Sequence, residues 1–371
     1  MTLPSLPGEP PAGSFAARRA EHGESLSPRE RWLAVLRRET PDRVPMDYWA
    51  TVETTQRLLQ HLRCDFEEML RRLHIDQPLT VKGRYVGPPP RRGGDIWGLR
   101  YEKVDHGTGA YLETVHAPLA AYQSVEEIEA HYAWPDPDHW DYSHLPERIR
   151  GHERRPIRGG GSEPFLLYRR LRGDEQAYMD LILHPDIVQY CLDKLFHLAY
   201  QNTLRIFEAI PHQVMITYVA EDLGSQRTLL MSPDCIRRFL LPGMKRVIDL
   251  TRQNGSFVFC HSDGAIREIL PDLIEAGIQA LNPVQWRLPG MEREGLKRDF
   301  GSQLIFHGGM DNQQTLPFGT VEDVRREVED NYRILGAGGG YILAPCHNLQ
   351  EITPPENIVA LYETGYALGW R

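Results

Sequence analysis

Six short segments of the chain are apolar and rich in β-branched or aromatic residues, a pattern typical of buried β-strands. They cover residues 44–50, 213–220, 256–261, 278–283, 303–309 and 341–345. In the C-terminal half, an amphipathic run with helical periodicity separates each of these segments from the next. Strands that alternate with helices in this way predict repeated βα units and a parallel sheet.

Polar, glycine-rich clusters follow most of the predicted strands: EDLGSQ, HSDG, NPVQ, GGMDNQ and CHN. In a closed barrel the carboxyl ends of all strands meet at one mouth, where such clusters form the active site. We therefore expect an α/β fold, a single (β/α)8 TIM barrel, with a doubly wound open sheet as the alternative. Residues 84–118 contain Pro-Pro-Pro, Gly-Gly and two alternating segments, which predict an inserted β-hairpin.

Helix start signals support this reading and set the domain boundary. Residues 27–30 read Ser-Pro-Arg-Glu, a capping box with proline at the first helical position, which predicts an N-terminal helical extension. Similar signals stand at Ser124, Thr320 and Thr353. Another helix is expected over 233–255, kinked at Pro242 and ended by Gly255.

Residues 1–24 carry four prolines and three glycines without apolar periodicity, which predicts a disordered or loosely packed tail. Residues 25–371 are expected to form one domain.

The composition narrows the class of protein. The chain has 371 residues and a formal net charge of -9, which argues against nucleic acid or an anionic membrane as the main partner. No apolar run approaches the length of a membrane span, and the first residues lack a hydrophobic signal region. The five widely spaced cysteines do not form a disulfide framework. We expect a cytoplasmic protein, with Trp32, Trp49 and Trp97 in its core.

Two clusters could carry metal chemistry. His261 and Asp263 follow a predicted strand two residues apart, so both side chains can face the mouth of the barrel. That spacing suits two ligands of one metal ion, or a hydrogen bond that closes a loop. Cys346 and His347 follow another strand; being adjacent, they should point to opposite sides, so one of them at most faces the mouth.

Acidic residues at other strand ends complete the set. Glu221, Asp222 and Asp311 follow two of the predicted strands, and Asp47 with Tyr48 lies in the first. In a barrel mouth such groups serve as a base, a metal ligand or a partner for a cation, whereas in a loop they cap the next helix. We expect Asp222, Glu221, Asp47 and Asp311 to be the catalytic residues.

Four stretches together resemble the uroporphyrinogen decarboxylase superfamily. They cover residues 28–49, 221–249, 260–285 and 306–363, and the likeness runs from about residue 27 to 369. The resemblance implies a single (β/α)8 barrel with its site at the C-terminal mouth. Authentic decarboxylases of the superfamily carry an arginine-rich signature after the first strand, and this chain has Tyr-Trp-Ala-Thr-Val-Glu over 48–53 instead. We therefore expect no turnover of uroporphyrinogen, whose eight carboxylates need several cations.

The other branch of the superfamily comprises corrinoid-linked methyltransferases, whose zinc is held by a His-x-Cys pair and a distant cysteine. His261 matches the histidine, Asp263 replaces the first cysteine, and the distant cysteine aligns with His347, or with Cys346 after a shift of one residue. The resemblance thus implies a divalent metal at His261, Asp263 and His347, with zinc expected.

Three functions follow as hypotheses. The first is metal-dependent methyl or related group transfer, with a corrinoid supplied by a carrier protein or as free cobalamin. The second is a cofactor-free decarboxylase of a smaller acid, and the third is a non-catalytic ligand-binding barrel. The partner in each case is a small-molecule substrate, and a homodimer is left open. We assign substrate binding to six residues: Gln226, Tyr48, Arg84, Arg158, Asn282 and Asn348.

Overall fold

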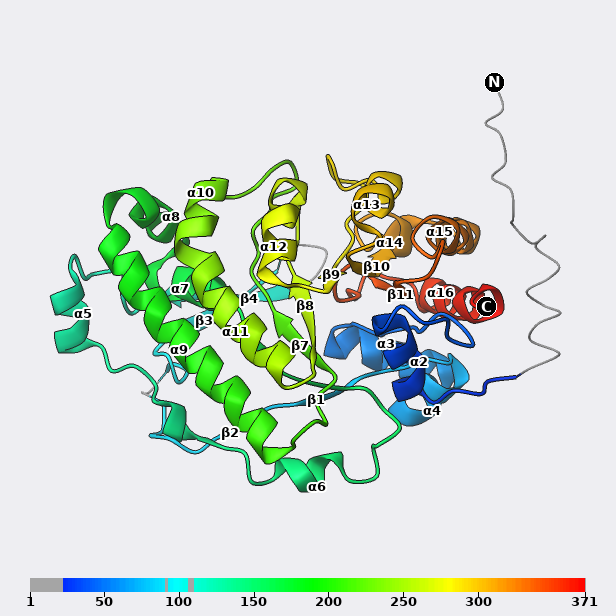
Figure 1. Ribbon diagram of the computed structural model, residues 1–371, viewed down its shortest axis with the longest axis horizontal. Helices are drawn as coiled ribbons and strands as arrows, with labels where there is room; N and C mark the ends of the chain where they lie inside the picture. Colours follow the sequence, from blue (N-terminus) through cyan, green and yellow to red (C-terminus); the bar gives the residue numbers. More distant parts are fainter. Residues whose placement is uncertain (1–22, 91–92, 106–109, 371) are drawn as a thin grey trace.

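The computed structural model describes residues 23–90, 93–105 and 110–370 (Figure 1). Residues 1–22 of the expected tail lie outside this range. Glu24, the last residue of that tail, forms ion pairs with Arg31 and Arg43. Within the described residues, no helix combines the length and the apolar character that crossing a membrane requires.

A curled sheet of seven parallel strands forms the centre of the molecule. Its order is β1-β6-β7-β8-β9-β10-β11, and each pairing is parallel. The strands are β1 Leu79–Val81, β6 Ile157–Ser162, β7 Ile216–Val219, β8 Phe257–His261, β9 Ala280–Asn282, β10 Ile305–Met310 and β11 Tyr341–Pro345. Five of the six predicted strands are confirmed, whereas β1 and β6 were not predicted. Parallel strands buried by helices on one side and by the interior on the other are apolar, as the sequence indicated.

The segment 44–50, predicted as the first strand, forms isolated bridges in place of a continuous strand. Met46 pairs in parallel with Leu343 of β11, and Ala50 pairs with Leu349. On its other side the backbone oxygen of Met46 accepts a hydrogen bond from the N–H of Asp76. Pro45 has no N–H to donate, which interrupts the ladder. Among the described residues the sheet therefore has seven strands, where the prediction was eight.

Helices follow the strands of the sheet. They are α7 Pro164–Arg172, α8 Asp174–Leu183, α9 Pro185–Ala209, α10 Pro233–Cys235, η2 Ile236–Leu240, α11 Leu241–Gln253, η3 Arg267–Ile269, α12 Leu270–Ala276, α13 Arg293–Phe300, α14 Thr315–Phe318, α15 Val321–Ile334 and α16 Pro355–Leu368. Near Pro242, where a kink or break was predicted, the hydrogen-bond pattern changes from the π-helical turn η2 to the α-helix α11. Thr320 caps α15 as predicted, but Thr353 does not cap α16, whose first turn has Pro354 as its N-cap residue without a side-chain hydrogen bond.

The connection between β1 and β6 contains the predicted insertion. Strands β3 Arg100–Asp105 and β4 Ala110–His116 form the expected antiparallel hairpin. A second small sheet pairs β2 Arg84–Tyr85 with β5 Trp140–Asp141. The remaining elements of the insertion are α5 Val125–His131, η1 Pro137–His139 and α6 Leu145–Ile149.

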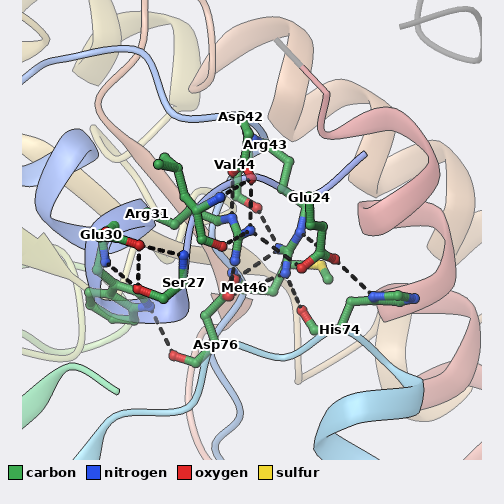
Figure 2. A network of polar contacts seen from close by, with 12 residues as sticks. Glu24, Ser27, Glu30, Arg31, Asp42, Arg43, Val44, Met46, His74 and Asp76 are labelled. Atoms are coloured by element: carbon green, nitrogen blue, oxygen red, sulfur yellow. Dashed lines mark hydrogen bonds and ion pairs between the residues drawn. The ribbon is translucent and has the colours of Figure 1, made fainter. Parts of the chain in front are cut away.

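The N-terminal helices α2 Pro28–Leu36, α3 Val52–Leu62 and α4 Phe66–Arg72 lie beside β11 and α16 (Figure 1). Trp32 of α2 packs against Phe259 in a cluster of apolar side chains from the sheet interior, so α2 covers one end of that interior. A buried ion network, drawn in Figure 2, holds this arrangement: Asp76 accepts hydrogen bonds from Arg31 (2.5 Å) and Arg43 (2.8 Å). Asp76 also accepts the backbone N–H of Met46, which ties the network to the segment 44–50.

Candidate metal centre

Two histidines and one aspartate meet where β8 and β11 end. His261 is the last residue of β8, Asp263 follows two residues later, and His347 comes two residues after β11. One possible ligand atom of each lies within 4.8 Å of the others, and Nε2 of His347 is 3.9 Å from Oδ2 of Asp263. Imidazole and carboxylate are ligands of zinc and of other first-row divalent ions. The structure thus brings together the three side chains expected as ligands.

The carboxylate of Asp263 fits a bound cation. Its Oδ1 atom is buried and has no hydrogen-bond partner among the described residues. The backbone N–H of Asp263 donates to Oδ1 of Asp222, which fixes the position of the loop. Burial raises the pKa of Asp263, while the two histidines oppose this rise. A buried carboxylate oxygen without a partner is costly, and a divalent ion held by the same three residues would satisfy it.

A buried chain of hydrogen bonds extends from His261 into the interior of the sheet. Nδ1 of His261 lies 2.5 Å from Oδ1 of Asn282, and Nδ2 of Asn282 lies 2.6 Å from Nδ1 of His307. Nε2 of His307 in turn lies 3.0 Å from the carboxylate of Asp47. His307, Asn282 and Asp47 are almost fully buried.

This chain of hydrogen bonds determines which ring nitrogen carries a proton in His261 and in His307. The carboxylate of Asp47 accepts a hydrogen bond, so Nε2 of His307 donates to it, and Nδ1 of His307 accepts from the amide of Asn282. The amide oxygen of Asn282 then faces a protonated Nδ1 of His261. The lone pair of His261 is therefore on Nε2, which is the nitrogen left for a metal ion.

Cys346 points away from the three residues. Its side chain is buried, and its thiol donates to the backbone oxygen of Val284 at 3.1 Å. Burial raises the pKa of the thiol well above its usual value, so it stays protonated. Adjacent residues after β11 thus diverge as expected, with His347 toward the cluster and Cys346 toward the wall.

A cavity of about 610 Å³ opens beside the cluster. His261, His347 and Asn348 line one part of it, and Arg158 with Trp49 lines another. The full lining also includes Thr80, Val81, Lys82, Gly83, Trp140, Tyr142, Gly159, Gly160, Gly161, Ser162, Glu163, Asn202, Ile206, Tyr218 and Ala220. Its size falls in the range of small-molecule sites.

Glycines of β6 make one wall of the cavity. The pairing of β6 with β7 shifts register between Arg158 and Gly161, and Gly160 and Gly161 both have positive φ. A Cβ atom on Gly161 would lie 1.6 Å from the backbone oxygen of Tyr218. The bulge therefore depends on glycine, and it replaces side chains with backbone where a ligand could lie.

Two carboxylates predicted as catalytic, Glu221 and Asp311, form hydrogen bonds and ion pairs with neighbouring loops and helix starts. Glu221 accepts hydrogen bonds from the N–H groups of Phe165 and Leu166 in the first turn of α7, and burial raises its pKa well above the usual value. Asp311 contacts Arg287 and accepts from the N–H of Thr315. These two carboxylates are engaged at helix starts and in an ion pair.

The predicted substrate-binding residues divide between the cavity and other places. Arg158 and Asn348 line the cavity. Asn282 lies beneath it, between His261 and His307. Tyr48 packs against Phe66 and Tyr362 and bonds to Thr55. Gln226 is exposed in a turn after β7, and Arg84 pairs with Asp141 at 2.7 Å in the small β2-β5 sheet.

Sequence analysis did not predict the positions of four residues of the site. Trp49, predicted as core, lines the cavity and stacks on His261 with ring centroids 5.8 Å apart. His307, Tyr218 and Glu163 were not selected. A signal for His307 existed in the sequence. His307 lies two residues after the apolar Ile305 on β10, so both side chains face the interior of the sheet. The pKa of Glu163 is raised by burial and lowered in part by His261.

Comparison with known proteins agrees with the fold. Among solved structures, a methyltransferase from Methanosarcina mazei has 19% identity and a TM-score of 0.66, covering 92% of this chain and 99% of that one. A 3-keto-D-glucoside 4-epimerase, YcjR, from E. coli has 14% identity and a TM-score of 0.35, covering 60% of this chain and 82% of that one. SrfJ from Salmonella typhimurium has 11% identity and a TM-score of 0.36, covering 87% and 74%. The last two similarities are too low to bear on the fold.

No curated protein matches the chain. The family model of uroporphyrinogen decarboxylase (URO-D) matches residues 146–367, which is more than half of the sequence. This match spans β6 to β11 and contains all three residues of the metal cluster. The chain therefore belongs to the uroporphyrinogen decarboxylase family.

Proposed function

We propose that the protein is a metal-dependent transferase of methyl or related groups. The observation that carries this proposal is the cluster of His261, Asp263 and His347, with an unpartnered buried oxygen of Asp263, at the edge of a cavity. The fold similarity to the methyltransferase from Methanosarcina mazei supports the same branch of the family. In this proposal the segment 44–50 serves as the eighth strand of a (β/α)8 barrel, whose mouth holds the site.

A divalent ion held by the cluster would act as a Lewis acid, lowering the pKa of a bound thiol or water and so activating the methyl acceptor. Zinc suits two imidazoles and one carboxylate, and iron and manganese also accept this set. One carboxylate and one imidazole in place of two thiolates would leave a bound ion more positive than it is in a thiolate site.

The protein's own residues prepare the site for this chemistry. Asn282 orients His261 so that its Nε2 faces the cluster, and Asp222 holds the backbone of Asp263. Trp49 covers one face of the His261 ring, which limits the access of water to it. We propose that Asn348 and Arg158, on the cavity wall, contact the substrate. The methyl donor in this proposal is a corrinoid, free or delivered by a partner protein.

Decarboxylation of a small acid is the second candidate, and the cations in the cavity favour it. Arg158 and Lys82 both line the cavity and could hold one or two carboxylates, far fewer than the eight of uroporphyrinogen. Asp47, one of the expected catalytic residues, already accepts hydrogen bonds from His307, Trp49 and the backbone of Tyr48. Group transfer therefore remains the function that the site supports best.

The test is methyl transfer from methylcobalamin to a panel of small thiols under anaerobic conditions. We expect zinc-loaded protein to consume methylcobalamin, with the methylated thiol detected by mass spectrometry. Asp263→Asn should lose this activity, whereas Cys346→Ser, which changes a buried thiol outside the cluster, should keep it. Activity that survives both a chelator and Asp263→Asn would contradict the proposal, and carbon dioxide release from small acids by chelated protein would favour the second candidate.

A further inference from the structure

Arg158 is fixed in the cavity wall by contacts that leave part of its guanidinium free. Its Nε and Nη2 atoms both donate to the hydroxyl of Thr80, at 3.0 and 2.8 Å. The guanidinium also stacks on Trp49 and Tyr218, with its central carbon 5.4 and 5.5 Å from the two ring centroids. These contacts orient the side chain, which stays half-buried at the cavity wall.

No carboxylate of residues 23–90, 93–105 and 110–370 forms an ion pair with Arg158 or with Lys82, which lines the same cavity. Lys82 stands two residues after Thr80 in the chain, so an extended backbone directs the two side chains to the same face. By contrast, Arg84 in the neighbouring sheet is paired with Asp141. Arg158 is half-buried and Lys82 is exposed, so both charges are accessible to an anion that enters the cavity, and the charge of Arg158 is the less hydrated of the two.

The cavity is polarised. Arg158 and Lys82 carry positive charge, while Glu163 and Asp263 stand with the histidine cluster. Trp49 contacts both Arg158 and His261, so one indole ring separates the cation from the cluster. Trp140, Tyr142 and Tyr218 add further aromatic surface to the lining.

We propose that Arg158, assisted by Lys82, binds the acidic group of an anionic small-molecule substrate whose apolar body lies along Trp49 and Tyr218. This inference deepens the proposed function, because the opposite end of the bound molecule is then directed to His261 and His347. The substrate class is a small acid with one or two negative charges and a flat or apolar body.

The experiment measures binding of three probes of similar shape to purified protein: benzoate, benzenesulfonate and neutral benzamide. Calorimetry or ligand-observed NMR is carried out on zinc-loaded protein and after treatment with a chelator. We expect one or both anions to bind with or without zinc, and benzamide to bind at least about tenfold more weakly. A preference for benzoate over benzenesulfonate would assign the acid as a carboxylate, and the reverse would assign it as a sulfonate.

Arg158→Gln should weaken binding of the anions at least about tenfold and leave benzamide unchanged. Lys82→Gln should have the same direction with a smaller effect, and because Lys82 is exposed this variant tests the site even if Arg158→Gln does not fold. Arg84→Gln is the matched control and should bind the probes like the wild type.

The inference is overturned if wild-type protein binds none of the probes, if benzamide binds as well as benzoate, or if Arg158→Gln and Lys82→Gln both bind the anions normally. Anion binding that requires zinc and survives Arg158→Gln would also overturn it, because the metal would then hold the acid. The zinc content of each variant, measured in parallel, separates this result from the proposed function. Wild-type protein that holds zinc but binds neither anion refutes only the anion site, and wild-type protein that binds the anions but has no zinc affinity refutes only the metal-dependent function.

Discussion

Replacing Asn282 with leucine removes the side chain that joins His261 to His307. Leucine is similar in size, so the change deletes two hydrogen bonds of 2.5 and 2.6 Å with little change in packing volume. His261 Nδ1 then loses the acceptor that fixes its proton, and Nε2 is no longer held as the free lone pair. We expect the metal affinity to fall.

The magnitude follows from the structure. Loss of a hydrogen bond that orients a metal-binding histidine lowers metal affinity about 10- to 100-fold. At a zinc concentration about 100 times the wild-type Kd, zinc stabilises the wild type by about 2.7 kcal/mol. The same concentration should stabilise Asn282→Leu by only about 0.4 to 1.4 kcal/mol. The metal-free variant should also be less stable by about 2 kcal/mol, because two buried ring nitrogens lose their partners.

The assay combines zinc competition against a chromophoric chelator with thermal unfolding at several zinc concentrations. Asn331→Leu is the matched control, since Asn331 is equally buried and bonds to Gly309 and Arg293 away from the cluster. It should lose stability without losing zinc affinity. A folded Asn282→Leu variant with wild-type zinc affinity would refute the role that we assign to the hydrogen-bond chain.

Three further predictions concern the fold. Asp76→Asn removes the charge between buried Arg31 and Arg43 and should lower the free energy of unfolding by about 3 kcal/mol, measured as a lower denaturant midpoint; an unchanged midpoint would contradict the importance of the network. Burial opposes the charge of Glu24, but the His74 hydrogen bond and the charges of Arg43 and Arg31 hold its pKa at about 2, below the ordinary value of 4.5. Ionised Glu24 thus stabilises the fold by about 1 kcal/mol above pH 4.5, and this contribution is lost as the pH falls toward 2. The free energies of unfolding of wild type and Glu24→Gln should therefore converge between pH 4.5 and 2. A difference between them that does not depend on pH would contradict this prediction. Gly161→Ala should cost about 3 kcal/mol or more in thermal unfolding because its Cβ meets Tyr218, whereas Gly151→Ala, with similar φ and open space, should cost about 1 kcal/mol; equal costs would show that the contact with Tyr218 relaxes freely.

The strands of the C-terminal half could be predicted from the sequence because burial on both sides makes them continuous apolar runs. The strand β11 matches its predicted bounds, 341–345. The strands β1 and β6 carry no such signal, since β1 has three residues and β6 reads Ile-Arg-Gly-Gly-Gly-Ser. Their positions are set by pairing with neighbours that are distant in the sequence.

The site could be predicted as far as local spacing reaches. The two-residue separation of His261 and Asp263 places both at the mouth, and the divergence of adjacent residues separates Cys346 from His347. The choice between Tyr48 and Trp49 depended on the direction of an irregular segment, which the pattern does not fix. Glu221 and Asp311 follow strands but also precede helices. An acidic residue at the end of a strand can face the site or bind the N–H groups at the start of a helix, and the sequence does not distinguish these two roles.

The link between Asn282 and His307 joins neighbouring strands and depends on register, which becomes visible only when β9 and β10 are paired. Sequence alone offered Asn282 as a polar residue at a strand end. Its side chain instead supports the cluster from the interior of the sheet.

The most direct test of the central claim is the amount of zinc bound by His347→Ala and by Cys346→Ser, measured by elemental analysis after dialysis against metal-free buffer. If His261, Asp263 and His347 hold the ion, wild type and Cys346→Ser retain stoichiometric zinc, while His347→Ala loses it because two ligands rarely hold zinc against buffer. Thermal unfolding of the metal-free proteins checks that each variant is folded. Zinc retained by His347→Ala and lost by Cys346→Ser would show a thiolate site and contradict the account.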